Sequence, residues 1–324
     1  MSPSAVSYRR NLAGLAALAL LQLAVGLLVT NSYYLTVVAL CMIFGIAAVG
    51  LTILMGHAGL ISLGQSAFFG IGAYVAAGLT TNLGVEPIAS LLAGAAAAAA
   101  LGWAIARPLL RLSDLYFAMA SLAFGIVMYI LYGQLRSLTG GLDPGFSSAP
   151  FRILGWRLGD TRSMFWVCCV ALLLVLFVAI NLIHSRFGRA LRALGSAETA
   201  VSALGISVAA YKTSALAISA AVAGLAGGLF AFFLRSFNAS AFGFGLSIEL
   251  LIMVIVGSIH SIWGALFGAA LVVILPSTLE SFEEYKLFVY GIAMVLIMMT
   301  MPDGLFHAAV AGGRGLLSRR RKRP

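Results

Sequence analysis

Residues 12–55 contain two long apolar stretches in succession, LAGLAALALLQLAVGLLV (12–29) and YLTVVALCMIFGIAAVGLTILM (34–55). Each stretch is close to the roughly 20 apolar residues that an α-helix needs to cross the hydrocarbon core of a bilayer. No charged side chain interrupts either of them. The pattern therefore predicts membrane-spanning helices, because a surface helix of a soluble domain would carry a polar face.

The rest of the sequence has the same character. Of the 324 residues, 62% are hydrophobic and only 9% are charged, and the mean hydropathy is +1.06, whereas soluble domains carry about 25% charged residues. We expect an all-α integral membrane protein with about ten transmembrane helices. The third, eighth and ninth are Gly-rich or short, so each is either a full span or a broken or re-entrant helix buried inside the protein. The ten expected spans are residues 11–30, 34–55, 61–80, 87–106, 115–134, 164–184, 213–234, 247–259, 262–279 and 285–301.

The distribution of charge predicts the orientation in the membrane. With ten spans and both termini in the cytoplasm, 14 of the 20 Lys and Arg residues fall on the cytoplasmic side, which then carries a net charge of +11 against −1 outside. Such an excess of cations on the cytoplasmic side is typical of membrane proteins. It also explains the net charge of +10, so no nucleic-acid partner is expected. The division is a cytoplasmic segment 1–10, a transmembrane domain 11–301 and a basic cytoplasmic tail 302–324.

Two loops are long enough to carry function, and they lie on opposite sides of the membrane. The outer loop, residues 135–163, is rich in Gly and Pro, which set turns. The inner loop, residues 185–212, reads SRFGRALRALGSAETAVSALGISVAAYK. Its mixed polarity predicts a short helix, a break at Gly195 and Ser196, and a second short helix that ends at Gly205. A plain surface loop is the simpler interpretation, and a docking element for a cytoplasmic partner is the functional one.

The sequence contains no motif that indicates catalysis. No G-x-x-x-x-G-K-[ST] phosphate loop occurs, so any ATP hydrolysis must belong to another chain. Cys41, Cys168 and Cys169 lie in apolar stretches without ligand spacing, so no metal site and no cofactor is expected. Glu249 and Asp114 are the ionisable residues of the spans, which is little for an ion-driven pump.

Uncharged polar residues are the better candidates for lining a path through the membrane. Ser62, Gln65 and Ser66 are spaced three and four apart, so they share one helix face, and Ser121 lies in the middle of the fifth span. A buried Gln also serves commonly as a hydrogen-bonding contact between helices, which is the structural alternative. The pairs Gly224 with Gly228 and Gly264 with Gly268 predict close packing of helices.

Several blocks of the sequence carry a resemblance to a known family. They are GHAGLISLGQSAFFGIGAY (56–74), LYFAMASLAFG (115–125), LTGG (138–141), SRFGRALRALGSAETAVSALGI (185–206), YKTSALAISAAVAGLAGGLFA (211–231), SIELLIMVIVGSIHSIWGALFGA (247–269) and PDGL (302–305). With these blocks the chain resembles the inner-membrane permease subunits of branched-chain amino-acid ATP-binding-cassette importers, and the LivM type more than the LivH type.

The resemblance implies a set of partners. A member of this family pairs with a second, LivH-like permease, binds two cytoplasmic ATPase subunits and receives its solute from a periplasmic binding protein. The inner loop then corresponds to the ATPase-coupling segment. Its residues in this sequence are Arg186, Gly188, Arg189, Arg192, Glu198, Ala200, Ala203 and Gly205.

Other functions remain open from the sequence. Related permeases with the same blocks import urea, short amides or other small polar solutes. A secondary transporter driven by an ion gradient would need acids in the middle of its spans, and a membrane scaffold would need no polar stripe. The resemblance favours import of branched-chain or related hydrophobic amino acids across a bacterial inner membrane.

Overall fold

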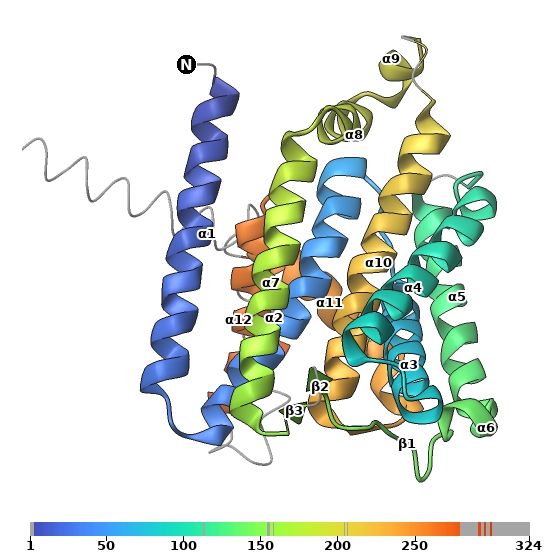
Figure 1. Ribbon diagram of the computed structural model, residues 1–324. Helices are drawn as coiled ribbons and strands as arrows, with labels where there is room; N and C mark the ends of the chain where they lie inside the picture. The colour runs from blue at the N-terminus through green and yellow to red at the C-terminus, as the bar shows by residue number, and fades with distance from the viewer. Residues whose placement is uncertain are drawn as a thin grey trace, which may run out of the picture.

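The computed structural model describes residues 3–278, apart from 113, 154, 155, 158, 204 and 206, together with 291, 292, 295 and 299. These residues form a bundle of helices (Figure 1). The longer helices are α1 (Pro3–Leu28), α2 (Ser32–Thr52), α3 (Gln65–Leu83), α4 (Pro87–Leu109), α5 (Asp114–Gln134), α7 (Thr161–His184), α10 (Val208–Leu234), α11 (Phe244–Gly257) and α12 (Ile262–Thr278).

Short elements connect the long helices. A π-helical turn, η1 (Ile53–His57), ends α2, and a 3-10 turn, η2 (Ala239–Phe242), precedes α11. The inner loop forms α8 (Arg186–Ser196) and α9 (Glu198–Ala203). The outer loop forms α6 (Arg136–Thr139) and the two-residue strands β1 (Phe146–Ser147), β2 (Arg152–Ile153) and β3 (Trp156–Arg157), while β4 (Ser236–Phe237) follows α10. β1 pairs antiparallel with β4, and β2 pairs antiparallel with β3.

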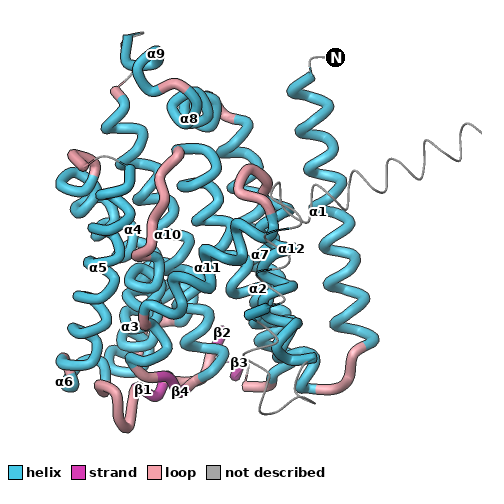
Figure 2. The backbone as a smooth tube through the Cα atoms, turned by 180° about the vertical axis from the view of Figure 1, so that it is seen from behind, coloured by secondary structure: helices cyan, strands magenta, loops and turns pink. Residues whose placement is uncertain are grey.

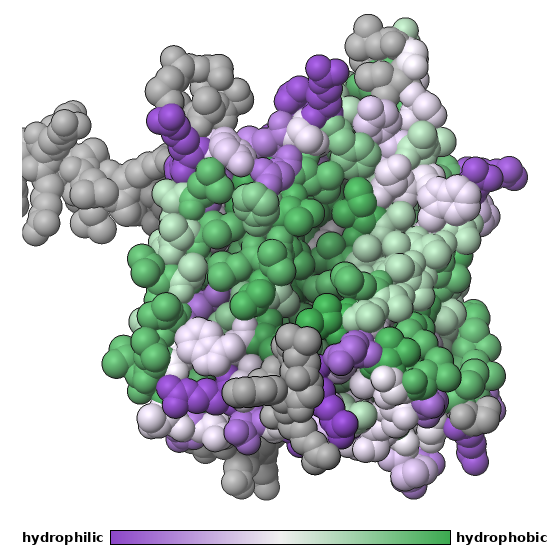
Figure 3. Space-filling model, viewed as in Figure 1, coloured by the Kyte–Doolittle hydropathy of each residue, from purple (hydrophilic) through white to green (hydrophobic). Residues whose placement is uncertain are grey.

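The surface confirms that a bilayer is the solvent of the bundle. Figure 3 shows a broad hydrophobic belt with hydrophilic side chains gathered at both ends. Within the described part of the chain, α1, α2 with η1, α4, α5, α7 and α10 are each long and apolar enough to cross a membrane. α11 and α12 are shorter apolar helices of 14 and 17 residues. The span expected at 285–301 lies almost entirely outside the described residues.

The two ends of the bundle differ in what they carry. α8 and α9 lie at the end where α1 begins, and β1–β4 lie with α6 at the opposite end (Figure 1). The inner and outer loops therefore face opposite sides of the bundle. Spans that alternate in direction across a membrane would also put these two loops on opposite sides.

Small residues allow α10 to pack tightly between α3 and α4. A Cβ atom at Gly227 would lie only 1.8 Å from the Phe69 carbonyl oxygen, and one at Gly72 would lie 1.9 Å from the Gly224 carbonyl oxygen. Such approach of two helix backbones is how helices associate in lipid, where apolar side chains gain little by leaving the solvent. The predicted close packing is confirmed: a Cβ at Gly228 would lie 2.7 Å from Leu91, and one at Gly268 would lie 1.9 Å from the Met253 carbonyl oxygen.

Candidate functional site

The chain between α2 and α3 crosses part of the bundle without helical structure. After η1 the residues 59–64 form neither helix nor strand, and Figure 2 shows them as a loop between α5 and α11. We call residues 59–64 the chain break. Glycines permit this course: Gly59 has a φ of +71°, and Gly56 packs so closely against the α11–α12 turn that a Cβ would lie 1.9 Å from the Ile259 carbonyl oxygen.

This segment corrects the expected third span. The sequence predicted a helix over 61–80, but α3 begins only at Gln65. A helix that begins inside the membrane leaves its first N–H groups without intrahelical acceptors. Because lipid supplies none, other parts of the protein must supply them.

Two serines, one on α5 and one on α11, accept hydrogen bonds from backbone N–H groups at the start of α3. The Ser121 hydroxyl of α5 accepts a hydrogen bond from the Leu63 N–H at 3.0 Å and donates to the Ala118 carbonyl at 2.8 Å. The Ser247 hydroxyl of α11 accepts from the Ser66 N–H at 3.0 Å and donates to the Ser66 hydroxyl oxygen at 2.8 Å. All three serines are buried. The start of α3 is thus tied to α5 and α11 at once.

The remaining polar candidates also form hydrogen bonds within the protein. The Gln65 side-chain amide donates to the Ser219 hydroxyl of α10 at 2.9 Å, and its carbonyl oxygen is buried without a partner in the described part of the chain. Ser62 accepts from the Gly64 N–H at 3.4 Å. The structure therefore brings Ser62, Gln65, Ser66 and Ser121 together around the chain break, with every one of their side chains buried.

Sequence reasoning missed the partners Ser219 and Ser247. Both are small polar residues inside apolar helices, and Ser247 opens one of the blocks quoted above. The place of Ser247 in that block was the available signal. The serines were missed because a lone serine in a spanning helix points to a hydrogen-bond partner less clearly than a Gln does.

The inner loop is anchored by α8. The Ser185 hydroxyl caps the helix by accepting from the Gly188 N–H at 3.3 Å, and a Cβ at Gly188 would lie 2.4 Å from the Ile183 carbonyl oxygen. Arg189 and Arg192 donate to the carbonyls of His184 and Ile183 at 3.0 and 3.2 Å, so they satisfy the last turn of α7.

One face of α8 packs directly on the start of the chain break. Leu191 and Leu194 are buried in an apolar cluster that also contains Leu54 of η1 and Leu60 of the break. A Cβ at Gly195 would lie 2.9 Å from the His57 carbonyl oxygen, and the Gly195 Cα lies 3.4 Å from where a Cβ of Gly59 would be. α8 is therefore in close backbone contact with the end of η1 and the start of the break.

α9 is tied to α10 by an ion pair. The Lys212 ammonium lies 2.5 Å from the Glu198 carboxylate, with the Lys212 side chain 11% exposed and the Glu198 side chain 50% exposed. Lys212 was not singled out from the sequence. The second helix ends at Ala203, two residues before Gly205, whose φ is +78°. The break predicted at Gly195 and Ser196 lies instead at Ala197, since α8 continues through Ser196. Arg186 and Ala203 are exposed and Ala200 lies within α9.

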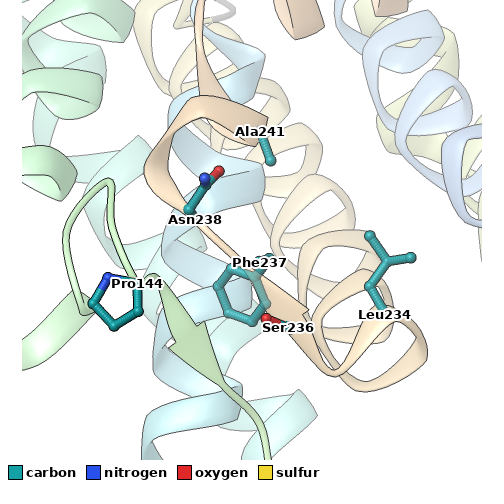
Figure 4. A pocket seen from close by; sticks show the side chains of 6 residues that line it. All are labelled: Pro144, Leu234, Ser236, Phe237, Asn238 and Ala241. Atoms are coloured by element: carbon teal, nitrogen blue, oxygen red, sulfur yellow. The ribbon is translucent and has the colours of Figure 1, made fainter.

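The opposite end of the bundle carries a shallow pocket of about 280 Å³. Figure 4 shows Pro144 of the outer loop across from Phe237 and Asn238 of the segment that follows α10. The Asn238 side-chain amide donates to the Leu142 carbonyl at 3.1 Å, and the Arg235 guanidinium donates to the Gly159 carbonyl, so the outer loop is tied to this segment. The other lining residues are Leu234, Ser236 and Ala241. Over the described residues, no group of three or more His, Cys, Asp or Glu is placed to hold a metal ion.

A known protein family matches most of the chain. The family described as branched-chain amino acid transport system / permease component matches residues 33–298. The chain belongs to this permease family. The family consists of transport subunits of a membrane, not of enzymes, and its match begins in α2 and so leaves α1 outside.

Curated relatives agree with the family. The permease is 35% identical over 301 residues to the high-affinity branched-chain amino acid transport system permease protein LivM of Escherichia coli K12, with 83% of this chain and 69% of the relative covered. It is 26% identical to the corresponding protein LivH of Salmonella typhimurium, with 81% of this chain and 90% of the relative covered. A probable LivM of Methanocaldococcus jannaschii is 24% identical, with 84% and 90% covered. No solved structure matches the permease.

Proposed function

We propose that this chain is the LivM-type transmembrane subunit of an ATP-binding-cassette importer for branched-chain amino acids. Its place is the inner membrane, where it spans the bilayer several times. The observation that carries the proposal is the family match over most of the chain together with an amphipathic elbow, α8–α9, at one end of the bundle. The substrate is the one that the names of the LivM and LivH relatives give for those proteins.

The proposal includes a topology of ten spans with both termini in the cytoplasm, divided at 1–10, 11–301 and 302–324. The elbow of α8 and α9 then lies in the cytoplasm, and the outer loop lies in the periplasm. The positions of α8–α9 and of β1–β4 at opposite ends of the bundle support this assignment, as does the cytoplasmic excess of cations in the sequence.

The partners follow from the same proposal. A second permease of the LivH type completes the membrane part, since both types are relatives of this chain. Two ATPase subunits dock on α8–α9, and a periplasmic binding protein delivers the solute at the outer loop. This chain then needs no nucleotide site and no cofactor of its own.

The geometry supplies a route for the ATPase stroke. Exposed groups on α8–α9, with Arg186, Glu198 and Ala203 among them, are accessible to a docking subunit. Motion of α9 passes to α10 through the Glu198–Lys212 ion pair. Motion of α8 passes to the chain break through the contact of Gly195 with His57 and Gly59.

We further propose that the translocation path runs beside the chain break. Gln65, Ser66 and Ser121 shape it by holding the break and the start of α3 in place, because their hydrogen bonds join these to α5, α10 and α11. Ser62 adds a bond to Gly64 within the break. The ATPase stroke on α8 then acts on the segment next to the path.

Reversal of one charge tests the docking claim. Glu198→Arg should lower co-purification of the ATPase subunits and uptake of leucine. Because this change also breaks the ion pair with Lys212, the control is the double exchange Glu198→Lys with Lys212→Glu, which restores an ion pair but not the charge presented to a partner. If the exchange restores both readouts in full, Glu198 serves only within this chain and the docking claim for it is wrong.

Two other functions can each be distinguished from the proposed one by a measurement. The same architecture could import urea, short amides or another small polar solute, and the ligand profile of the binding protein encoded beside this chain decides between them and amino acids. A secondary transporter driven by an ion gradient would show uptake that survives ATP depletion and collapses with an ionophore.

A further inference from the structure

The LTGG block of the outer loop builds a turn at the outer end of the bundle. The Thr139 hydroxyl donates to the Tyr132 carbonyl at 2.6 Å and accepts from the Gly141 N–H at 3.2 Å. Gly140 and Gly141 have φ values of +71° and +70°, which glycine adopts without the steric cost that a side chain brings. A Cβ at Gly140 would lie 2.1 Å from the Gly145 carbonyl oxygen, so the chain folds back tightly on itself here.

The turn leads into β1, which lies beside β4, the strand that follows α10. The two strands pair in register, Phe146 with Phe237 and Ser147 with Ser236. We call this antiparallel pair the outer clasp. It joins the loop that follows α5 to the segment between α10 and α11, and each of its strands has only two residues.

Aromatic rings pack together beside the outer clasp. The ring centroids of Phe146 and Phe237 lie 5.9 Å apart, and the Tyr74 ring of α3 lies 6.2 and 5.2 Å from them. Phe242 of η2 and Tyr132 of α5 lie 5.3 and 5.1 Å from Tyr74. Such separations are those of packed aromatic pairs. All of these rings except that of Phe146 are buried, so the cluster joins α3, α5 and η2 to both strands of the clasp.

The same cluster reaches the start of α3. The Tyr132 hydroxyl donates to the carbonyl of Ala67 at 2.7 Å, and Ala67 directly follows Ser66. Tyr74 lies eight residues beyond Ser66, which is about 12 Å along the helix at 1.5 Å per residue. α3 continues to the outer end, where the Thr81 hydroxyl accepts a hydrogen bond from the outer loop at 3.0 Å. The rings therefore lie between the path proposed beside the chain break and the outer surface.

One group in the cluster is poorly suited to the paired clasp. The Tyr74 hydroxyl is buried, and no described residue forms a hydrogen bond with it. A buried hydroxyl without a partner loses the hydrogen bonds that water would supply, which costs free energy. Beside the clasp, Phe237 and Asn238 line the pocket that opens on the outer surface (Figure 4). Separation of the strands would let water from that side reach the hydroxyl, so the cost of burying it opposes the pairing.

We propose that the outer clasp, with the rings of Tyr74, Phe146 and Phe237, is the outer gate of the translocation path. The strands separate to admit the amino acid and pair again behind it. This inference rests on the proposed transport function and adds a gate at its outer end. The rings offer an apolar surface to the branched side chain of the solute, and the Tyr74 hydroxyl offers a hydrogen bond to its charged groups.

A reversible disulfide across the outer clasp tests the gate. Ser147 and Ser236 are exposed register partners, so both can be replaced by Cys with little change in shape. Because the Ser148 N–H donates to the Arg235 carbonyl at 2.7 Å, the adjoining pair of Ser147 and Ser236 is a non-hydrogen-bonded one. The Cα atoms of such a pair lie about 4.5 Å apart. This separation lies within the range of about 4.4–6.8 Å that a disulfide needs.

The variants are compared in the assembled transporter in proteoliposomes, with Cys41, Cys168 and Cys169 replaced by Ala. The control is Arg152→Cys with Arg157→Cys, which closes the β2–β3 hairpin within the outer loop and does not join that loop to α10. We expect oxidation to lower leucine uptake by Ser147→Cys with Ser236→Cys at least about tenfold, and a reductant to restore it. Oxidation of the control should leave uptake within about twofold.

Three results would overturn the gate. The first is leucine uptake by the oxidised clasp variant at the rate of its reduced form. The second is failure of the disulfide to form in the resting transporter, since the paired clasp would then not occur there. The third concerns the rate of disulfide formation, which the loaded binding protein with a non-hydrolysable ATP analogue should slow at least about fivefold; an unchanged rate contradicts opening.

Tyr74→Phe takes the place of the clasp variant if that variant does not assemble. This change removes the hydroxyl whose burial opposes the pairing, so it should slow leucine uptake severalfold at an unchanged amount of assembled transporter. Uptake at the parent rate would overturn the gate.

Uptake by the reduced clasp variant and by the parent separates this inference from the function on which it rests. If neither takes up leucine, the proposed substrate is wrong, and the rates of disulfide formation still decide for or against the gate. If leucine enters equally well with the disulfide closed, the transport function stands and the gate is overturned.

Discussion

Replacement of Ser247 by Ala should destabilise the permease more than replacement of its hydrogen-bond partner Ser66. The two hydroxyls lie 2.8 Å apart, and Ser247 in addition accepts the Ser66 N–H at 3.0 Å. Ser66→Ala removes only the bond between the hydroxyls, and the Ser247 hydroxyl that loses its acceptor can rotate to donate to a carbonyl of its own helix. Ser247→Ala removes both bonds and leaves a buried N–H at the start of α3 without an acceptor.

The geometry sets the expected magnitudes. A side-chain hydrogen bond between helices in a membrane contributes about 0.6 kcal/mol, so Ser66→Ala should lower the free energy of unfolding by about that amount. An unsatisfied buried donor adds about 1–3 kcal/mol, so Ser247→Ala should cost about 1.5–3.5 kcal/mol in all. The double variant should match Ser247→Ala within about 0.5 kcal/mol, since the bond between the hydroxyls is already absent.

Unfolding of the purified subunit by SDS in mixed micelles measures these differences. Ser214→Ala is the matched control, because its hydroxyl bonds only to the Ala210 carbonyl of its own helix. Its free energy of unfolding should stay close to that of the parent. An equal or larger cost for Ser66→Ala than for Ser247→Ala would refute the account of how α3 begins.

Three further predictions concern packing, coupling and ion dependence. Gly227→Ala places a Cβ 1.8 Å from the Phe69 carbonyl oxygen and should lower the free energy of unfolding by about 1–3 kcal/mol or more. The control Gly78→Ala on α3 meets no atom within 4 Å and should raise the free energy of unfolding by up to about 1 kcal/mol. Thermal unfolding measures both changes. Gly195→Leu should push α8 away from His57 and lower leucine uptake while the ATPase subunits still co-purify; normal uptake would contradict the route through the break. Glu249→Gln should leave ATP-driven uptake within about twofold of the parent, because no described residue forms an ion pair or hydrogen bond with this carboxylate and ATP rather than a proton drives transport; abolished uptake would favour ion coupling.

The sequence predicts where the chain enters the membrane better than how it runs there. Apolar runs located α2, α4, α5, α7 and α10, because a continuous spanning helix needs little beyond length and hydrophobicity. The glycines of the third run indicated that its helix could be broken, but the run did not show that α3 begins at Gln65 rather than at Ile61, since a broken segment is as apolar as a helical one.

The polar candidates show a second limit. Ser62, Gln65, Ser66 and Ser121 lie around the chain break, but the helix face predicted for Ser62, Gln65 and Ser66 is wrong for Ser62, which precedes α3. Their partners lie 58 to 181 residues away along the chain for the bonds that cross between helices, so neither Ser219 nor Ser247 could be assigned from spacing. Lys212 could not be assigned from spacing either, because its partner Glu198 lies 14 residues away across a turn.

Leucine uptake into proteoliposomes tests the central claim most directly. The vesicles contain this chain, its second permease and both ATPase subunits, with the binding protein outside and ATP inside. The account predicts uptake that requires ATP and the binding protein, persists with a protonophore and falls when Glu198→Arg replaces the parent chain. Uptake that continues without the ATPase subunits and collapses with the protonophore would contradict it.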